Sequence, residues 1–363
     1  DGVQKVAKPR RSPGRFLRRY GIWIMALTFL LLTWADRTWN ITGSPRATAV
    51  LLLVLFGAAV AMAYIYKRRA FCRYVCPIGA LTGLYAMTSV VELRSKEATC
   101  QGCGKVCYKG DVRFEGCPLY EYPRTLDTNR NCNLCARCIK SCPRDYFELR
   151  LRPPGRELWS LRSPLVGEAV LALLLVALVY MQTLDMTNAW GSYMRWVIRG
   201  GWLGGYKLAL TLSFLGGAAL VVAVYLGVSR LSSRAGGWQR NLASFGYAYI
   251  PLALAAHLGH NSSHLLGEGE RALKTAAAAL ASPFGLQVYV DYGSTGMPAL
   301  SQVWMVGVVA LGAAASLYTA WRIGARLRAS GQGSALPHLV FLLVLSALFV
   351  QLFLLPMNPR HSH

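Results

Sequence analysis

Seven long apolar stretches, separated by shorter polar segments, dominate the pattern of this chain. They cover residues 20–35, 48–66, 165–183, 208–228, 245–266, 300–321 and 336–356. A helix needs about 20 mostly apolar residues to cross a bilayer, so the pattern predicts seven transmembrane helices. The stretch at 20–35 is the weakest because Asp36 limits its length. No small-residue cleavage site follows it, so we interpret it as a signal anchor rather than a cleaved signal peptide.

The composition agrees with a membrane protein. Of the 363 residues, 54% are hydrophobic and only 15% are charged, whereas about 25% of the residues of a soluble domain are charged. This excludes a simple soluble enzyme and a disordered chain. The predicted fold class is an all-α polytopic membrane protein with one polar, cysteine-rich insert.

The distribution of cations predicts the orientation. The chain has 39 Lys and Arg residues and a net charge of +23. If the seven helices alternate in direction, 31 of these 39 cations fall on the side that carries the insert. Cytoplasmic loops attract Lys and Arg, so we expect a cytoplasmic insert and a periplasmic C-terminus. No nucleic-acid recognition motif accompanies the charge, so we expect membrane lipid rather than nucleic acid as its partner.

The cysteines carry the most specific chemical signal, and all ten lie between Cys72 and Cys142. The run from Cys132 to Pro143 has the spacing C-x2-C-x2-C-x3-C-P, which ligates cubane iron–sulfur clusters in bacterial ferredoxins. Zinc is the main alternative, since C-x2-C units also bind zinc. Zinc sites seldom add a third cysteine followed by C-x3-C-P, so the spacing favours a cluster.

A looser copy of the same motif precedes this run, from Cys100 to Pro118. In two-cluster ferredoxins the fourth cysteine of each motif ligates the other cluster, so we expect two [4Fe–4S] clusters with crossed ligands. The expected sets are Cys100, Cys103, Cys107 and Cys142 for the first cluster, and Cys132, Cys135, Cys138 and Cys117 for the second. The alternative keeps each motif's four cysteines together.

Two further cysteines, Cys72 and Cys76, form a C-x3-C-P motif with Pro77 directly after the second apolar stretch. Spaced i and i+4, they would share one face if the helix continued, but Pro77 is expected to end it. We interpret them as redox-active or metal-contacting thiols at the membrane surface. The alternative is a pair of inert interfacial cysteines, since a structural disulfide is disfavoured in the cytoplasm.

Three histidines of the fifth apolar stretch, His257, His260 and His264, are spaced i, i+3 and i+7 and so lie on one helix face. Ionisable residues inside a membrane usually mark function. A quinone site using His257 and His260 is the leading interpretation, because imidazole can bond a quinone oxygen and exchange its proton. Haem b shared with another subunit's histidine, a metal site, and plain hydrogen bonding between helices are the alternatives.

The C-x3-C-P motif followed by two ferredoxin motifs resembles the membrane-bound polyferredoxins of the NapH, NosR and FixG–CcoG type. The resemblance covers roughly residues 22–184. It implies a bacterial inner-membrane protein whose two cubane clusters pass electrons between the quinone pool, or a cytoplasmic donor, and other redox subunits. NapH and NosR usually carry a second membrane C-x3-C-P motif, and FixG-like proteins end in a periplasmic domain; this chain has neither pattern. The resemblance is therefore silent on residues 208–363.

Together these observations predict three regions. Residues 1–69 form a basic arm and two helices, residues 70–163 form a ferredoxin-like α+β insert, and residues 164–363 form five further helices. The predicted function is electron transfer between the clusters and a membrane quinone or partner subunit of a quinone-linked oxidoreductase complex. The alternatives are an accessory reductase for metalloenzyme maturation acting through Cys72 and Cys76, and a redox-sensing scaffold. Residues 100–150 contain nine Lys and Arg but only six Asp and Glu, so this part of the insert has a positive net charge. An acidic ferredoxin or flavodoxin is therefore a candidate electron donor.

Overall fold

The computed structural model describes residues 2–7, 11–96, 105–110, 115–142, 146–201, 204–233, 237–286 and 298–355. Within this part of the chain, seven helical segments are long and apolar enough to cross a membrane, as the hydropathy pattern predicts. They are Arg15–Trp39, Pro45–Ile65, Val166–Leu184, Tyr206–Ser232, Trp238–Leu266, Leu300–Ala329 and Leu336–Leu354. The prediction of a mostly helical membrane protein is confirmed.

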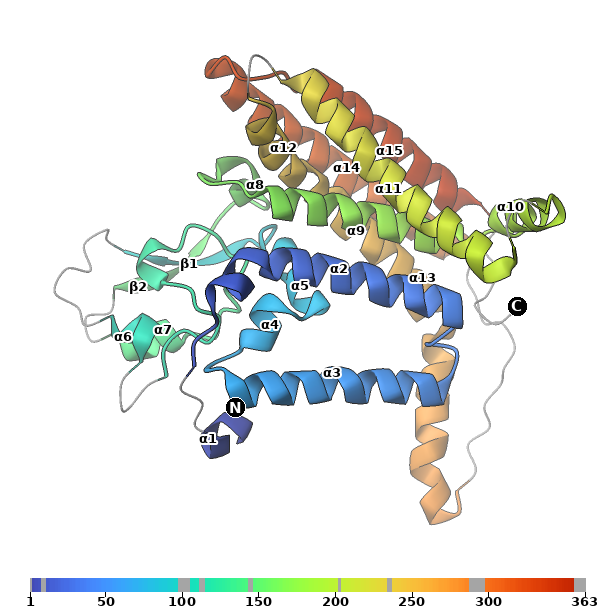
Figure 1. Ribbon diagram of the computed structural model, residues 1–363, viewed down its shortest axis with the longest axis horizontal. Coiled ribbons are helices and arrows are strands. Elements are labelled where there is room, and N and C mark those ends of the chain that lie inside the picture. Colours follow the sequence, from blue (N-terminus) through green and yellow to red (C-terminus); the bar gives the residue numbers. More distant parts are fainter. Residues whose placement is uncertain are drawn as a thin grey trace.

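Figure 1 labels most of the elements along the chain. The α-helices are α1 (Gly2–Ala7), α2 (Arg15–Trp39), α3 (Pro45–Ile65), α4 (Ala70–Tyr74), α5 (Pro77–Ala86), α6 (Val106–Lys109), α7 (Arg137–Ser141), α8 (Arg156–Ser160), α9 (Val166–Leu184), α10 (Asn188–Arg199), α11 (Tyr206–Ser232), α12 (Trp238–Gly246), α13 (Ile250–Ala281), α14 (Pro298–Ala329) and α15 (Leu336–Leu354). Short 3-10 turns lie at Pro123–Thr125, Tyr247–Tyr249 and Ser282–Phe284.

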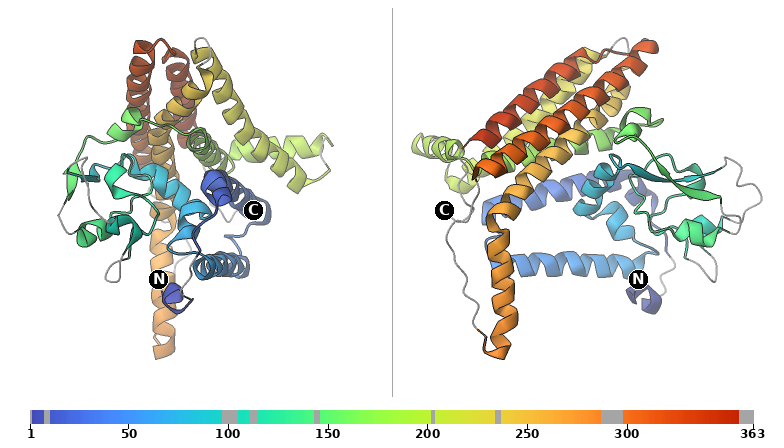
Figure 2. Two further views of the ribbon diagram at one scale, coloured as in Figure 1. Left: turned by 60° about the vertical axis from the view of Figure 1, so that its left-hand side comes forward. Right: turned by 180° about the vertical axis from the view of Figure 1, so that it is seen from behind.

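Helix α9 is the centre of the bundle. It packs against α2, α11, α12 and α13, and almost every side chain from Gly167 to Val179 is buried. Helix α3 is the opposite extreme, since none of its residues is buried and it lies apart from the bundle in Figures 1 and 2. A helix as apolar as α3 is stable in that position only when lipid or another protein surrounds it.

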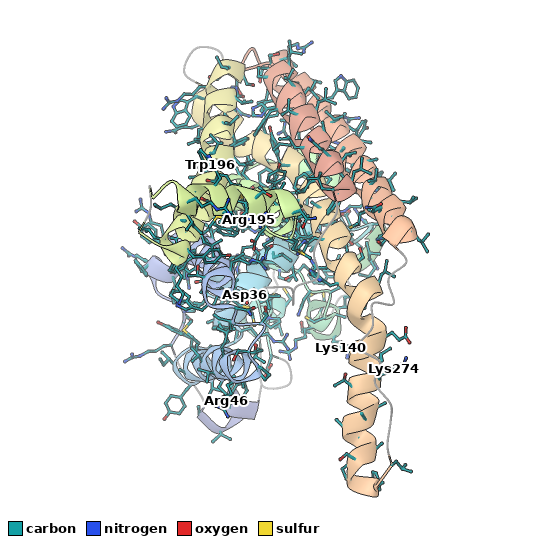
Figure 3. The ribbon with its side chains drawn as sticks, turned by 90° about the vertical axis from the view of Figure 1, so that its right-hand side faces the viewer. Asp36, Arg46, Lys140, Arg195, Trp196 and Lys274 are labelled. Atoms are coloured by element: carbon teal, nitrogen blue, oxygen red, sulfur yellow. The ribbon has the colours of Figure 1, made fainter. Side chains whose placement is uncertain are left out.

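The polar insert lies at one end of the bundle (Figure 1) and contains a two-stranded antiparallel sheet. Strand β1 (Val91–Ser95) pairs with β2 (Phe147–Leu151), with Val91 opposite Leu151 and Ser95 opposite Phe147. Figure 3 views the molecule from the other end, where Asp36, Arg46, Arg195 and Trp196 are labelled. Helix α10 at that end is amphipathic. Its buried side chains are Trp190, Met194 and Val197, while Arg195 and Arg199 are exposed.

Two details of the helices differ from the sequence pattern. The first span begins at Arg15, because its basic lead-in continues the helix instead of preceding it. Helix α13 continues beyond the apolar stretch that ends at residue 266 and includes the Ala-rich segment at 275–281. Between Pro251 in the first turn and Pro283 beyond the end no proline interrupts α13, and proline is the residue that most strongly breaks a helix. Figure 2 shows that α13 extends well beyond the neighbouring helices.

Glycines allow the closest helix contacts, because lipid offers little hydrophobic drive and small residues let backbones approach. Gly246 of α12 lies directly against Ala169 of α9, so that a methyl group there would collide with both the Cα and the Cβ of Ala169. Gly227 of α11, by contrast, faces open space.

We expect Gly246→Ala to lower the free energy of unfolding by about 1–3 kcal/mol, the usual cost of overpacking. The matched control, Gly227→Ala, should be neutral or stabilising by up to about 1 kcal/mol, since alanine favours the helix. Thermal unfolding of the purified protein in detergent measures both. Equal midpoints for the two variants would contradict the close α9–α12 contact.

Candidate functional site

Four cysteines of the insert surround one small pocket. Cys117, Cys132, Cys135 and Cys138 all line it, together with Leu93, Leu126 and the backbone between the cysteines. The loop achieves this by placing Leu134 (φ 50°) and Ala136 (φ 57°) in the left-handed region, which non-glycine residues rarely adopt and which often marks a functional loop. These two turns bring the three cysteines of the C-x2-C-x2-C run to the same side.

The chemistry of the pocket fits a cluster. Burial raises the pKa of Cys117 and Cys132, and it raises the pKa of Cys138 to about 12 with a smaller contribution from Cys132. The three thiols therefore stay protonated at neutral pH unless a metal displaces the protons. In the described residues no three Cys, His, Asp or Glu side chains are arranged around a single metal ion. Four thiols line one cavity, and the C-x2-C-x2-C spacing of three of them is the one that ligates a cubane cluster.

The remaining ferredoxin cysteines divide between described and undescribed residues. Cys107 and Cys142 pack around the same small core as Leu126 and Phe147, and the Cys117 N–H donates to the Cys107 carbonyl at 3.1 Å. Cys100 and Cys103 lie outside the described residues. The crossed assignment, which groups Cys117 with Cys132, Cys135 and Cys138, stays a prediction.

The C-x3-C-P motif does not form one helical face. Helix α4 ends at Tyr74, and Cys76 is the residue before Pro77, the first residue of α5. The turn is tight because Gly79 lies directly on the Cys72 carbonyl, where a side chain would collide. Cys72 is exposed and Cys76 is half-buried. Desolvation and the neighbouring Cys76 raise the pKa of Cys72, the opposite of the shift that activates a redox thiol.

The basic segment after α3 holds the insert in place, a role that the sequence does not reveal. Arg68 donates to the Tyr108 carbonyl at 2.5 Å and lies over the rings of Tyr108 and Tyr120. The Arg69 N–H donates to the carbonyl of Pro118 at 3.1 Å. This segment therefore contacts the residues on both sides of Cys117.

A second contact joins the C-x3-C-P motif to the cysteine pocket. Arg73, between the two cysteines of the motif, donates to Glu121 at 2.9 Å. Asn131 donates to the same carboxylate oxygen at 2.9 Å, and both Glu121 and Asn131 line the pocket. One carboxylate thus connects Cys72 and Cys76 with the loop that begins at Cys132.

The insert is tied to the membrane bundle by a buried ion pair. Arg130, two residues before Cys132, pairs with Glu168 in the first turn of α9, and the Glu168 side chain is only 2% exposed. The Tyr247 hydroxyl donates to the second oxygen of Glu168 at 2.6 Å. The Arg130 carbonyl lies against Gly83 of α5, where a Cβ would be 2.6 Å away.

The histidine face meets two different helices. The Nδ1 atom of His257 is 2.7 Å from the Tyr85 hydroxyl of α5 and 2.9 Å from the Ala253 carbonyl. Its buried Nε2 has no hydrogen-bond partner among the described residues. His260 is bonded instead to Thr183 of α9, at 2.9 Å, and its ring contacts that of His264. His260, at 4% exposed, is the more buried of the first two.

Comparisons with known proteins find iron–sulfur relatives for part of the chain. Residues 48–95 match the family described as a 4Fe-4S binding domain; this stretch contains Cys72 and Cys76 but none of the other eight cysteines. The chain is 33% identical over 96 residues to YccM of Escherichia coli K12, named as a candidate electron transport protein, covering 26% of this chain and 25% of that protein. No solved structure matches the chain.

Two relatives are named ferredoxin-type protein NapH. Identity is 30% over 110 residues to that of Escherichia coli K12, covering 29% of this chain and 36% of the relative. It is 27% over 168 residues to that of Haemophilus influenzae, covering 42% and 54%. The chain thus spans about a quarter to a half of these relatives. Its sequence and fold define a helical membrane protein that is similar to 4Fe-4S ferredoxin-type proteins. The resemblance to the membrane-bound polyferredoxins is confirmed.

We expect Arg130→Met to lower the free energy of unfolding by about 3–5 kcal/mol, because it leaves the Glu168 carboxylate buried without its cation. The double variant Arg130→Met/Glu168→Met should recover most of this loss. The control is Arg150→Met, whose pair with Glu148 is more exposed and should cost at most about 1 kcal/mol. Denaturant titration in detergent measures all three. The pair has no structural role if Arg130→Met is as mild as the control.

Proposed function

We propose that this chain is the membrane subunit of a quinone-linked redox complex and passes electrons between two [4Fe–4S] clusters and a membrane quinone or a partner subunit. The observation that carries the proposal is a continuous series of contacts. It leads from the cysteine pocket through Arg130 and Gly83 to α5, and from Tyr85 at the end of α5 to His257. Helix α5 is only ten residues long, or about 15 Å.

The cluster ligands that we propose follow the crossed assignment. Cys132, Cys135, Cys138 and Cys117 would hold one cluster and Cys100, Cys103, Cys107 and Cys142 the other. Such clusters supply one-electron storage when bound, at potentials that depend on charge, hydrogen bonds and solvent exposure. The loop residues position the thiols, and Leu93, Leu126 and Pro123 keep much of the pocket wall apolar.

His257 is the residue that we propose for the quinone. If Nδ1 accepts from the Tyr85 phenol, the ring proton is on Nε2; if Nδ1 donates to the Ala253 carbonyl, Nε2 is an acceptor. In both tautomers Nε2 is the buried ring nitrogen without a partner among the described residues. Such a group is costly, and a quinone oxygen would accept from the protonated Nε2, whereas a quinol hydroxyl would donate to the unprotonated one. His260 would support the site from the next turn through Thr183.

The orientation and partners are part of the same proposal. The cation-rich ends of the helices lie together at the insert end; Arg326 of α14, for instance, donates to the Leu161 carbonyl before α9. We propose that this end is cytoplasmic in a bacterial inner membrane, with the C-terminus periplasmic. Several insert cations, including Arg137 and Arg150, are paired with carboxylates. Exposed lysines such as Lys140 would meet an acidic ferredoxin or flavodoxin.

The purified, anaerobically handled protein should contain about eight irons per chain, from two cubane clusters. Cys135→Ser removes one ligand from the proposed second cluster and should lower the iron content by about half. Cys72→Ser, outside both sets, should leave it unchanged. Iron analysis and EPR of the reduced protein measure this. Stoichiometric zinc with little iron, or equal losses in both variants, would refute the ligand assignment.

Substituting His257 should separate quinone chemistry from cluster assembly. In His257→Leu we expect quinol-linked reduction of the clusters to slow by on the order of 100-fold or more, because a positioned acid–base group is lost. Reduction by dithionite and the iron content should stay normal. The control is His264→Leu, two turns further along α13. Unchanged quinol-linked reduction in a well-folded His257→Leu protein would remove this residue from the site.

A further inference from the structure

A groove of about 320 Å³ lies between α13 and α14, and neither the cysteines nor His257 are among the residues that line it. Leu254 and Leu258 of α13 form one wall and Leu311 of α14 the other, while Thr88 and Trp159 close the end beside the insert. Leu258 is 51% exposed and Leu311 74% exposed, so the groove opens sideways to the surroundings of two membrane-spanning helices. Its volume lies at the lower end of the range for ligand pockets.

Hydrogen-bond donors are scarce along the walls of the groove, because the Tyr318 hydroxyl and the Trp159 indole N–H that also line it lie together at the end beside the insert. The Thr88 hydroxyl donates to the Tyr85 carbonyl at 2.7 Å, and the Thr319 hydroxyl donates to the Ala315 carbonyl at 2.7 Å. Both hydroxyl protons are therefore used within their own segments. A quinone ring needs donors for its oxygens, whereas an aliphatic chain needs none, so the interior favours an aliphatic chain.

The end of the groove nearest the insert carries a cation. Arg322 lies over the rings of Trp159 and Tyr318, with its guanidinium carbon 5.6 Å and 5.9 Å from their centroids, and both rings line the groove. It donates to the Tyr318 hydroxyl at 3.1 Å. In the described part of the chain Arg322 forms no ion pair with a carboxylate. A guanidinium has five N–H donors, so most of them remain for an anion.

We propose that this groove binds an anionic phospholipid, with one acyl chain between α13 and α14 and the phosphate at Arg322. The apolar interior and the cation at its membrane-surface end match the two halves of such a lipid, and basic sites between membrane helices are known to suit anionic head groups. Trp159 belongs to α8, at the end of the insert, so the lipid contacts the insert and the bundle together. Binding therefore stabilises their contact. This site is independent of the electron-transfer proposal.

Native mass spectrometry and thermal unfolding of the full chain in detergent test the site, with phosphatidylglycerol and phosphatidylcholine of matched acyl chains as probes. The wild type should retain phosphatidylglycerol and unfold at a higher temperature with it than with phosphatidylcholine. Arg322→Gln should weaken phosphatidylglycerol binding about fivefold, the effect of one cation near an anionic head group. Arg328→Gln is the matched control, because Arg328 also lies in α14 but does not lie over the Trp159 and Tyr318 rings as Arg322 does.

A second variant tests the acyl chain separately from the charge. Ala315 is exposed and lines the groove, so Ala315→Phe should fill it and remove the retained lipid while Arg322 is kept. Equal binding of the two lipids, or equal effects of Arg322→Gln and Arg328→Gln, would overturn the proposal. So would displacement of phosphatidylglycerol by a short-chain quinone, which would make the groove a quinone site instead.

Discussion

The ion pair between Arg130 and Glu168 is the constraint on which the arrangement of the two parts depends. Glu168 lies in the first turn of α9, a largely buried helix at the centre of the bundle, where an isolated carboxylate would be costly. The matching cation comes from the loop that carries Cys132. Neither charge is satisfied unless the insert is folded and docked, so the pair couples the geometry of the cysteine pocket to that of the membrane helices.

Helix α5 connects the docked insert with His257 of α13. It begins at Pro77 of the C-x3-C-P motif and contacts the Arg130 carbonyl at Gly83. In its last turn, the Tyr85 hydroxyl contacts His257. Glu121 joins the same motif to the pocket through Arg73 and Asn131. The raised pKa of Cys72 argues against thiol chemistry at this motif. The structural role of the motif is to place the short helix α5 against the insert. An accessory thiol reductase is therefore the weaker interpretation.

The helices were predictable because burial in lipid requires long apolar runs, and seven such runs are separated by cationic segments. The pocket was largely predictable as well, since the ferredoxin spacing sets which cysteines can meet. The break between Cys72 and Cys76 was predicted only in part. Pro77 marks a helix boundary in the sequence, but the close approach of Gly79 to the Cys72 carbonyl is visible only in the structure. Contacts such as Arg130 with Glu168 or Tyr85 with His257 join segments of unrelated hydropathy. Such contacts produce no periodic pattern of residues along the sequence, so the sequence alone does not reveal them.

Quinol-driven reduction of the wild-type protein tests the connection between membrane and clusters most directly. The chain would be reconstituted alone in lipid vesicles, kept anaerobic and mixed with a short-chain quinol, and low-temperature EPR would follow the clusters. If His257 and α5 link a quinone to the cysteine pocket, reduced cubane signals should appear with quinol as they do with dithionite. Clusters that dithionite reduces fully, but that no quinol reduces at any ratio, would contradict that link.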